Sequence, residues 1–433
     1  MDEKYGKKVK NMFVSQQSTN IHEVDVTITV LTILYILHIA PYIAIHMPAA
    51  IYALDVFFLF ILLFLQCQKF GSLFRYLAPF VTIPLLNILL RDGVPTNIID
   101  VLKLLSGTFQ IWIYPLLSLY LIKKNNVNLA KSIFFIYALV ITIVGITSVI
   151  ACQDIPLIIR MNPGDLRGED EVMYQLKMNM NVGDFNNIYE YVLLMPVVVM
   201  VYKWSPFFKK GRFLRIASIT LAFFMYYVIF TSQFMTATIV ATLSLLLIFA
   251  PINMNKRTFI YSFVTLFLLF FVVKASIPPL LHSVANNYAG ETMAERLEHV
   301  ALALEGREAD IDEGSDFEER EKVYNRSYQT IIEYNIVGCW DHARTGGHSF
   351  ILDNIAKYGL LGFLLMYFMF KYVLERYVLI YKSRSWVYFY YYGFVIAGIL
   401  CYINPSGFYP QMYFVYPISA YLFEQILYRK SFL

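Results

Sequence analysis

A histidine that follows two glycines is the side chain in this sequence best suited to acid–base chemistry. His348 comes after Gly346 and Gly347 and before an apolar stretch that begins at Phe350. The glycines allow a sharp backbone turn, and a neutral imidazole in such a turn can take a proton from a hydroxyl nucleophile. The alternative is a histidine that caps a helix or satisfies a local hydrogen bond, and the residue alone does not decide between them.

Arginines near this turn suit the binding of a diphosphate, because the planar guanidinium makes paired hydrogen bonds to phosphate oxygens. Arg320, Arg326 and Arg344 precede the histidine, and Arg160 and Arg167 lie in an earlier polar segment. The same arginines could instead form ordinary surface ion pairs, because acidic residues surround them. No metal is expected, since the acidic clusters lack the spacing of a calcium loop and no His/Cys spacing suggests zinc.

The composition places these residues in a membrane protein. Hydrophobic residues make up 58% of the 433 residues and charged residues only 15%, against roughly 45–50% and about 25% in soluble domains. Apolar runs of about 20 residues recur, which is the length needed to cross a membrane as a helix. They are apolar on all faces, unlike the alternating strands of a membrane barrel. The net charge of +4 gives no reason to expect nucleic acid as a partner.

The apolar runs predict an all-α polytopic protein with about twelve transmembrane helices. They are expected at roughly 26–46, 51–67, 72–91, 99–122, 131–152, 186–203, 213–231, 234–251, 258–280, 350–372, 387–403 and 409–427. Every second connection is rich in Lys and Arg, from the N-terminal segment to Arg429 and Lys430. Because basic residues collect in cytoplasmic loops, both termini are expected in the cytoplasm.

This topology divides the chain into three parts. Residues 1–280 would form spans one to nine, with an outer loop at 153–185. Residues 281–349 would form a large extracytoplasmic loop, and 350–433 would hold spans ten to twelve. Apolar residues at helical spacing between Met293 and Leu304 predict one helix in the large loop, and a second is expected at 317–334.

Charged residues inside the spans are candidates for function, because their burial in hydrocarbon is unfavourable. Glu190 and Lys274 fall within spans six and nine, and Asp55, Asp100 and Lys103 lie in or at the start of other spans. All five are expected in the outward half of the membrane. Charges near span ends can instead reach the headgroups, and that alternative stays open for each of them.

Three further patterns occur around the histidine. Gly347–Leu352 opens an apolar helix with His-Ser, and Ala356–Gly362 follows it with Gly-Leu-Leu-Gly. Arg320 stands four residues before Tyr324, and Glu333–Gly338 ends in Asn-Ile-Val-Gly. With twelve spans and one large outer loop late in the chain, these motifs resemble those of the bacterial O-antigen polymerase and ligase superfamily.

The resemblance extends to one earlier motif and has three departures. Asn181–Asn187 is similar to the family's Gly- and Asn-containing segment before a mid-chain span. Ser349 stands where Asn is commoner, and Ile336 stands where the family usually has Pro. Gln233 occupies a position that is often Arg in the family. The diphosphate-binding role of that arginine would therefore fall to Arg160 or Arg167 in this chain.

The resemblance implies a metal-independent, GT-C-type glycosyltransferase without a cofactor, in the bacterial cytoplasmic (inner) membrane. Its substrates would be glycans on undecaprenyl diphosphate in the outer leaflet, and His348 would be the catalytic base. The arginines would bind diphosphate, with Tyr324, Glu190, Lys274 and Gln233 as further substrate-binding candidates. Membrane lipid, a chain-length regulator and a flippase would be its partners.

The leading hypothesis is a polymerase that joins lipid-linked repeat units into O-antigen or capsular or exopolysaccharide. A ligase that moves finished glycan to lipid A core or to protein would perform the same reaction on another acceptor. A flippase or other transporter is the alternative from a different class, and paired halves with charges at the membrane midplane would favour it. A non-catalytic scaffold is the remaining alternative.

Overall fold

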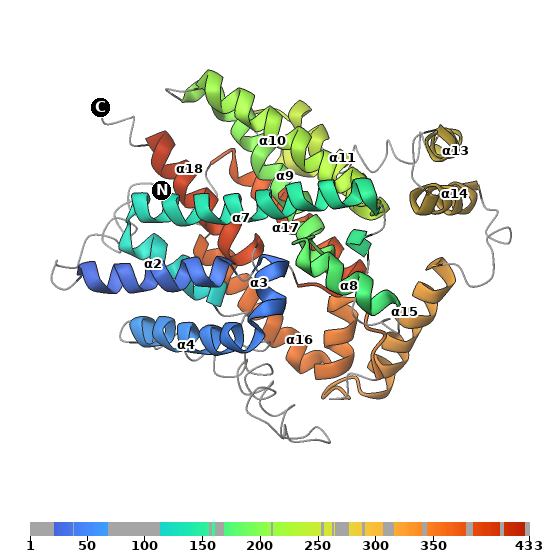
Figure 1. Ribbon diagram of the computed structural model, residues 1–433, viewed down its shortest axis with the longest axis horizontal. Coiled ribbons are helices and arrows are strands. Elements are labelled where there is room, and N and C mark those ends of the chain that lie inside the picture. Colours follow the sequence, from blue (N-terminus) through green and yellow to red (C-terminus); the bar gives the residue numbers. More distant parts are fainter. Residues whose placement is uncertain are drawn as a thin grey trace.

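The structure is a computed structural model and contains only helices and short turns in the residues that it describes (Figure 1). It describes residues 21–37, 39–67, 113–155, 158–160, 169–208, 211–252, 255–261, 264, 277–287, 291–305, 316–339, 344–377, 384–407 and 411–428. The prediction of an all-α chain is therefore confirmed for these residues. The predicted spans at 72–91, most of 99–122 and most of 258–280 lie outside them.

Three helices of the described part are long and apolar enough to cross a membrane. They are α7 (Val127–Asp154), α9 with the 3-10 turn after it (Phe185–Phe207), and α10 (Gly211–Thr231). Phe213 and Phe223 on α10 are 69% and 72% exposed. Large apolar side chains that face outward on a long helix fit a hydrocarbon surrounding rather than water. These features agree with a helical membrane protein, while the number of twelve spans stays a prediction.

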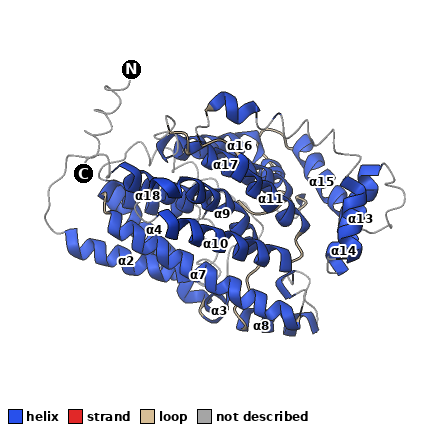
Figure 2. Ribbon diagram, turned by 90° about the horizontal axis from the view of Figure 1, so that it is seen from above, coloured by secondary structure: helices blue, strands red, loops and turns tan. Residues whose placement is uncertain are grey.

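Helix α9 is the centre of the bundle, with α7, α10, α11 (Met235–Leu246) and α17 (Val387–Ile403) packed around it (Figure 2). Its start is fixed by a reciprocal cap, in which Asp184 accepts from the backbone of Asn187 and Asn187 accepts from the backbone of Asp184. The cap satisfies donors that a helix start leaves without partners. The Asn181–Asn187 motif thus has a structural role, and it positions the whole of α9.

Aromatic side chains lock the C-terminal helices onto α9. A π-helix at Gln411–Val415 leads into α18 (Tyr416–Tyr428). The buried hydroxyl of Tyr416 donates to the Leu193 carbonyl of α9 at 2.7 Å. Gly393 of α17 leaves room for this ring, because a Cβ there would lie 2.4 Å from the tyrosine oxygen. Close packing of this kind makes the core sensitive to single methyl groups.

The first predicted span is wrong as a continuous helix. Instead of one helix at 26–46, the chain forms α2 (Ile21–Leu37) and the short α3 (Pro41–His46), and α4 (Pro48–Cys67) follows. Pro41 and Pro48 each stand at the start of a helix, where the missing N–H of proline does no harm. Hydropathy alone does not register these starts, because the residues around them are apolar.

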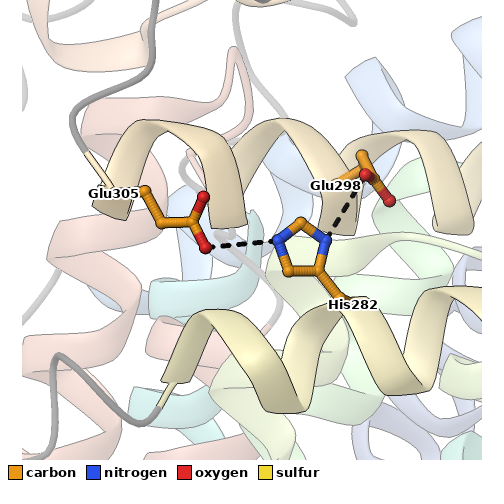
Figure 3. Close-up of polar contacts among 3 residues, drawn as sticks. All are labelled: His282, Glu298 and Glu305. Atoms are coloured by element: carbon orange, nitrogen blue, oxygen red, sulfur yellow. Dashed lines mark ion pairs between the residues drawn. The ribbon is translucent and has the colours of Figure 1, made fainter.

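Two helices of the large loop form a hairpin, α13 (Ile277–Asn287) and α14 (Glu291–Glu305). The helix predicted between Met293 and Leu304 is confirmed by α14. His282 of α13 has a Glu298 oxygen 3.4 Å from Nδ1 and a Glu305 oxygen 3.4 Å from Nε2 (Figure 3). The carboxylates lie on opposite sides of the ring, so they join the two helices and do not converge on one point.

The third loop helix, α15 (Asp316–Glu333), confirms the helix predicted at 317–334 and packs against α16 (Phe350–Tyr377). The continuous span predicted at 350–372 is wrong, because α16 is broken at Gly359, where φ is 70° and ψ is −178°. The turn after α15 fills the break: Leu360 N donates to Asn335 O at 2.9 Å, and Cys339 N donates to Ala356 O at 3.0 Å.

Two glycines allow this crossing. Gly338 and Gly359 both have positive φ, and a Cβ on either one would lie 2.2 Å from a backbone oxygen of the other segment. Only glycine fits such a close approach of two backbones. The motifs Glu333–Gly338 and Ala356–Gly362 are thus two halves of one junction between α15 and α16.

Candidate functional site

The turn that carries His348 is held from below by a chain of hydrogen bonds. The backbone N–H of Gly346 donates to Ser327 Oγ of α15 at 2.8 Å, and this hydroxyl donates to Asp353 of α16 at 2.6 Å. The other Asp353 oxygen accepts from Ser349 N at 3.0 Å. A carboxylate that accepts bonds from both flanks fixes the turn between them.

The start of α16 is capped without the histidine. Ser349 Oγ accepts from Leu352 N at 3.1 Å, and Phe350 N donates to the Asn404 carbonyl at the end of α17 at 2.7 Å. These bonds satisfy the helix start. His348 itself is exposed, and its ring makes no hydrogen bond with another described residue. His348 therefore does not cap the helix, and its imidazole is available to a ligand.

The backbones of Arg326, on α15, and Arg344, in the turn, meet at Thr330 of α15. Thr330 Oγ1 lies 3.0 Å from the carbonyl oxygen of Arg326 and 2.7 Å from that of Arg344. Both arginine side chains are exposed. The guanidinium of Arg344 lies over the Tyr334 ring, 5.4 Å from its centre, and donates to the Tyr334 hydroxyl. This surface can therefore attract an anion beside the histidine turn.

Tyrosines join α15 to the end of α17 behind these arginines. Tyr324 donates its hydroxyl to Ile403 O at 3.0 Å, and its ring stacks on Tyr402 with a centroid distance of 6.4 Å. The hydroxyls of Tyr402 and Tyr328 share a hydrogen bond, which raises the pKa of Tyr328. Tyr324 is thus placed in the predicted neighbourhood, where it positions α15 through its hydroxyl.

Three residues of this site escaped the sequence analysis: Ser327, Asp353 and Asn404. Asn404 is 4% exposed, and its Nδ2 finds no hydrogen-bond partner in the described part of the chain. A buried amide donor without a partner beside the start of α16 suits an acceptor atom of a ligand. The spacing of Ser349 and Asp353 at a helix start was the available signal for the clamp.

Glu190 and Gln233 belong to other neighbourhoods. Glu190 is 3% exposed on α9 and hydrogen-bonds the side chain of Gln411 in the π-helix. Its Oε1 has no partner among the residues described. Gln233 lies in the turn between α10 and α11 with φ of 56° and lines a cavity of about 200 Å³ with Cys152 and Tyr227.

The remaining candidates fall outside what the structure describes. Arg167 and Lys274 are outside the described residues, as are Asp100 and Lys103, while Arg160 and Arg320 are described by their backbone alone. Cys152 and Cys339 do not form a disulfide with each other. Within the described ranges, no group of three His, Cys, Asp or Glu residues could hold a metal ion.

No protein-family model, curated protein or solved structure matches the chain. The geometry of the site therefore carries the functional argument. It offers one accessible imidazole on a clamped turn, one exposed guanidinium group from the adjacent helix, one from the start of the turn, and one buried amide donor.

Proposed function

We propose that this chain is a metal-independent glycosyltransferase that joins lipid-diphosphate-linked oligosaccharide units at the outer face of the bacterial inner membrane. The observation that carries the proposal is the exposed His348 ring on a turn clamped by Ser327 and Asp353, with Arg326 on the neighbouring helix and Arg344 at the start of the turn. A clamped base can meet a substrate hydroxyl without first being ordered, which lowers the entropic part of the barrier.

In the proposed reaction, the acceptor sugar hydroxyl attacks the anomeric carbon of the donor glycan. The new bond joins that oxygen to the carbon, the bond from the carbon to the diphosphate breaks, and the imidazole takes the hydroxyl proton. The lipid diphosphate leaves with the electron pair, and the arginines offset its negative charge. General-base catalysis of this kind contributes about 10²–10⁴-fold in rate.

The test is incubation of the purified chain with an undecaprenyl-diphosphate-linked repeat unit, with products separated on a gel. The wild type should give a ladder, and His348→Ala should reduce its rate of formation by about 100-fold or more. His299→Ala is the matched control, because His299 is a half-buried histidine of α14 in the same loop. A normal ladder from His348→Ala would contradict the proposed role of the imidazole.

A ligase would use the same site with another acceptor, so a ladder with the repeat unit alone favours the polymerase. Transfer to lipid A core without a ladder favours the ligase.

A transporter is favoured by one observation, the buried Glu190 beside Gln411. Ionisable groups inside a bundle often mark a transport path. Two results together would support transport and count against the polymerase. The wild type would move a lipid-linked glycan across the liposome membrane without forming a ladder, and Glu190→Gln would lose this movement.

A further inference from the structure

The last turn of α15 and the turn that follows it expose large aliphatic side chains. Ile332 is 75% exposed, Ile336 is 65% exposed and Val337 is 63% exposed. They stand at the end of a helix whose other exposed positions include Asn325, Arg326 and Gln329. An exposed apolar group of this kind at the end of a polar helix marks a surface that something covers.

The same surface continues on α16. Leu360 and Leu361 are 52% and 59% exposed, and Leu361 N donates to Ile336 O at 3.3 Å, which keeps the two groups of side chains adjacent. Farther along α16, Leu364 and Tyr367 are also exposed. We call the apolar patch the five residues Ile332, Ile336, Val337, Leu360 and Leu361. It is thus the end of an apolar stripe that runs along α16 at helical spacing.

Two pairs of a basic residue and a tyrosine stand beside the apolar patch in the chain. Arg344 lies over the ring of Tyr334, and Lys357 Nζ lies 5.1 Å from the centre of the Tyr358 ring. Tyr334 precedes Ile336 by two residues, and Tyr358 precedes Leu360 by two. Tyrosine with Arg or Lys at the edge of an apolar surface is the pattern of the membrane–water boundary.

We propose that the turn at 334–338 inserts into a phospholipid leaflet, so that acyl chains cover the apolar patch and anionic headgroup phosphates lie at Lys357 and, where no lipid diphosphate occupies it, at Arg344. The aliphatic stripe along α16 provides the continuity with the hydrocarbon, and the two cations match the charge of the headgroups. The loop helix α15 is then anchored at the membrane surface through its own end as well as through α16. Because the Arg344 and Arg326 carbonyls share Thr330, the candidate site is held at headgroup level.

The insertion can be tested with a photo-crosslinking amino acid, p-benzoylphenylalanine, in the full-length chain. It would replace Ile336, Asn325 or Leu364 one at a time, in vesicles of phosphatidylcholine and phosphatidylglycerol. Asn325 is exposed on α15 about two turns before Ile332 and is the control outside the patch, while Leu364 is the control on the α16 stripe. All three positions are exposed, so the substitutions do not disturb the core.

Mass spectrometry of the irradiated protein would identify what lies at each position. We expect phospholipid adducts at positions 336 and 364 and none at position 325. Crosslinks at 336 to a second copy of the chain, crosslinks within the chain, or no adduct there would each overturn the proposal.

The headgroup contact has its own measurement. Arg344→Gln in the variant labelled at position 336 should lower the share of phosphatidylglycerol among the adducts by about fivefold, since one basic residue near an anionic surface contributes about 1 kcal/mol. An unchanged share would overturn the phosphate contact. Neither readout depends on glycan transfer, so the proposed function can fail while the insertion stands.

Discussion

The bundle around α9 and the junction of α15 with α16 are held together by different kinds of contact. In the bundle, large side chains reach across to neighbouring helices, as Tyr416 does to Leu193 O and Tyr191 does to Ile141 O. At the junction, backbone meets backbone through Gly338 and Gly359, and small polar groups complete the contact. All of the α9 side chains from Asn187 to Met200 are buried, whereas Arg326, Arg344 and His348 at the junction are exposed.

The difference shows how a fold can present polar residues without covering them. Burying a side chain to hold it in place removes it from the surface, as happens to Glu190. A contact made by glycine backbones and a serine–aspartate pair fixes the turn from behind and leaves the side chain of His348 in the open. Such a contact has little tolerance for added atoms, because no side chain stands between the backbones to adjust.

The largest expected effect comes from adding one methyl group at the junction. Gly359→Ala forces a Cβ to within 2.2 Å of Ile336 O at a residue with φ of 70°, and it should lower the free energy of unfolding by about 3 kcal/mol. Gly398→Ala is the control, since a Cβ there meets no atom within 4 Å. Both are measured by denaturation in detergent, and equal stabilities would remove the distinction drawn between the two regions.

The buried side chain of Lys177 makes the stability of the protein depend on pH. Lys177 of α8 (Glu169–Asn179) is 1% exposed and donates to Ile159 O at 2.8 Å. Burial lowers its pKa from 10.5 to about 8. Below pH 8 both states carry the proton and burial of the charge opposes folding. Between pH 8 and 10.5 only the unfolded chain keeps the proton, so stability rises with pH by about 3 kcal/mol in total.

Lys177→Met should remove this rise, because methionine has no proton to lose. The measurement is the difference in unfolding free energy between the wild type and the variant at pH 8 and at pH 10.5, which cancels other titrating groups. A difference that stays constant over this range would contradict the lowered pKa.

The clamp beneath the histidine should matter less than the glycine crossing. Ser327→Ala leaves Gly346 N without its acceptor and Asp353 without one donor, and it should reduce stability by about 1–3 kcal/mol. Asn325→Ala, at an exposed position of the same helix, is the control. Hydrogen exchange at residues 344–349 provides a second readout, and an unchanged exchange rate would show that the turn is held by other means.

The smallest expected effect is in the core itself. Tyr416→Phe keeps the ring and removes only the hydroxyl that donates to Leu193 O, so it should reduce stability by about 1 kcal/mol. Thermal unfolding of the variant alongside Gly359→Ala compares the two regions directly. A larger loss from Tyr416→Phe than from Gly359→Ala would reverse the order argued here.

Helices with clear boundaries could be predicted from the sequence. The predicted span at 387–403 coincides with α17, and the predicted loop helix at 317–334 differs from α15 by one residue at each end. Apolar runs and amphipathic spacing determine such elements locally. The break at Gly359 was not predictable in this way, because a glycine inside an apolar run can have either a negative or a positive φ.

The sequence singled out the polar side chains that the candidate site exposes, but not the residues that hold the turn in place. His348, Arg326 and Arg344 stand out by residue type and lie on one junction. Ser327, Asp353 and Asn404 act through partners that are distant in the chain, and serine, aspartate and asparagine are common at every turn and cap. The pairing of Gly338 with Gly359 likewise depends on tertiary contact, which two separate motifs do not contain.

The break in α16 also fixes the distance between the imidazole turn and the apolar part of the helix. From Phe350 to the break, the helix is a rod about 14 Å long at 1.5 Å per residue, with the imidazole turn at its tip. After the break, Leu360 to Tyr377 extend for about 27 Å, close to the thickness of a hydrocarbon core of about 30 Å. The short first part of α16 therefore holds the imidazole turn at a fixed distance from the long apolar part. Removing one helical turn would shorten this rod by about 5.4 Å, and the imidazole turn could then no longer keep its bond to Ser327.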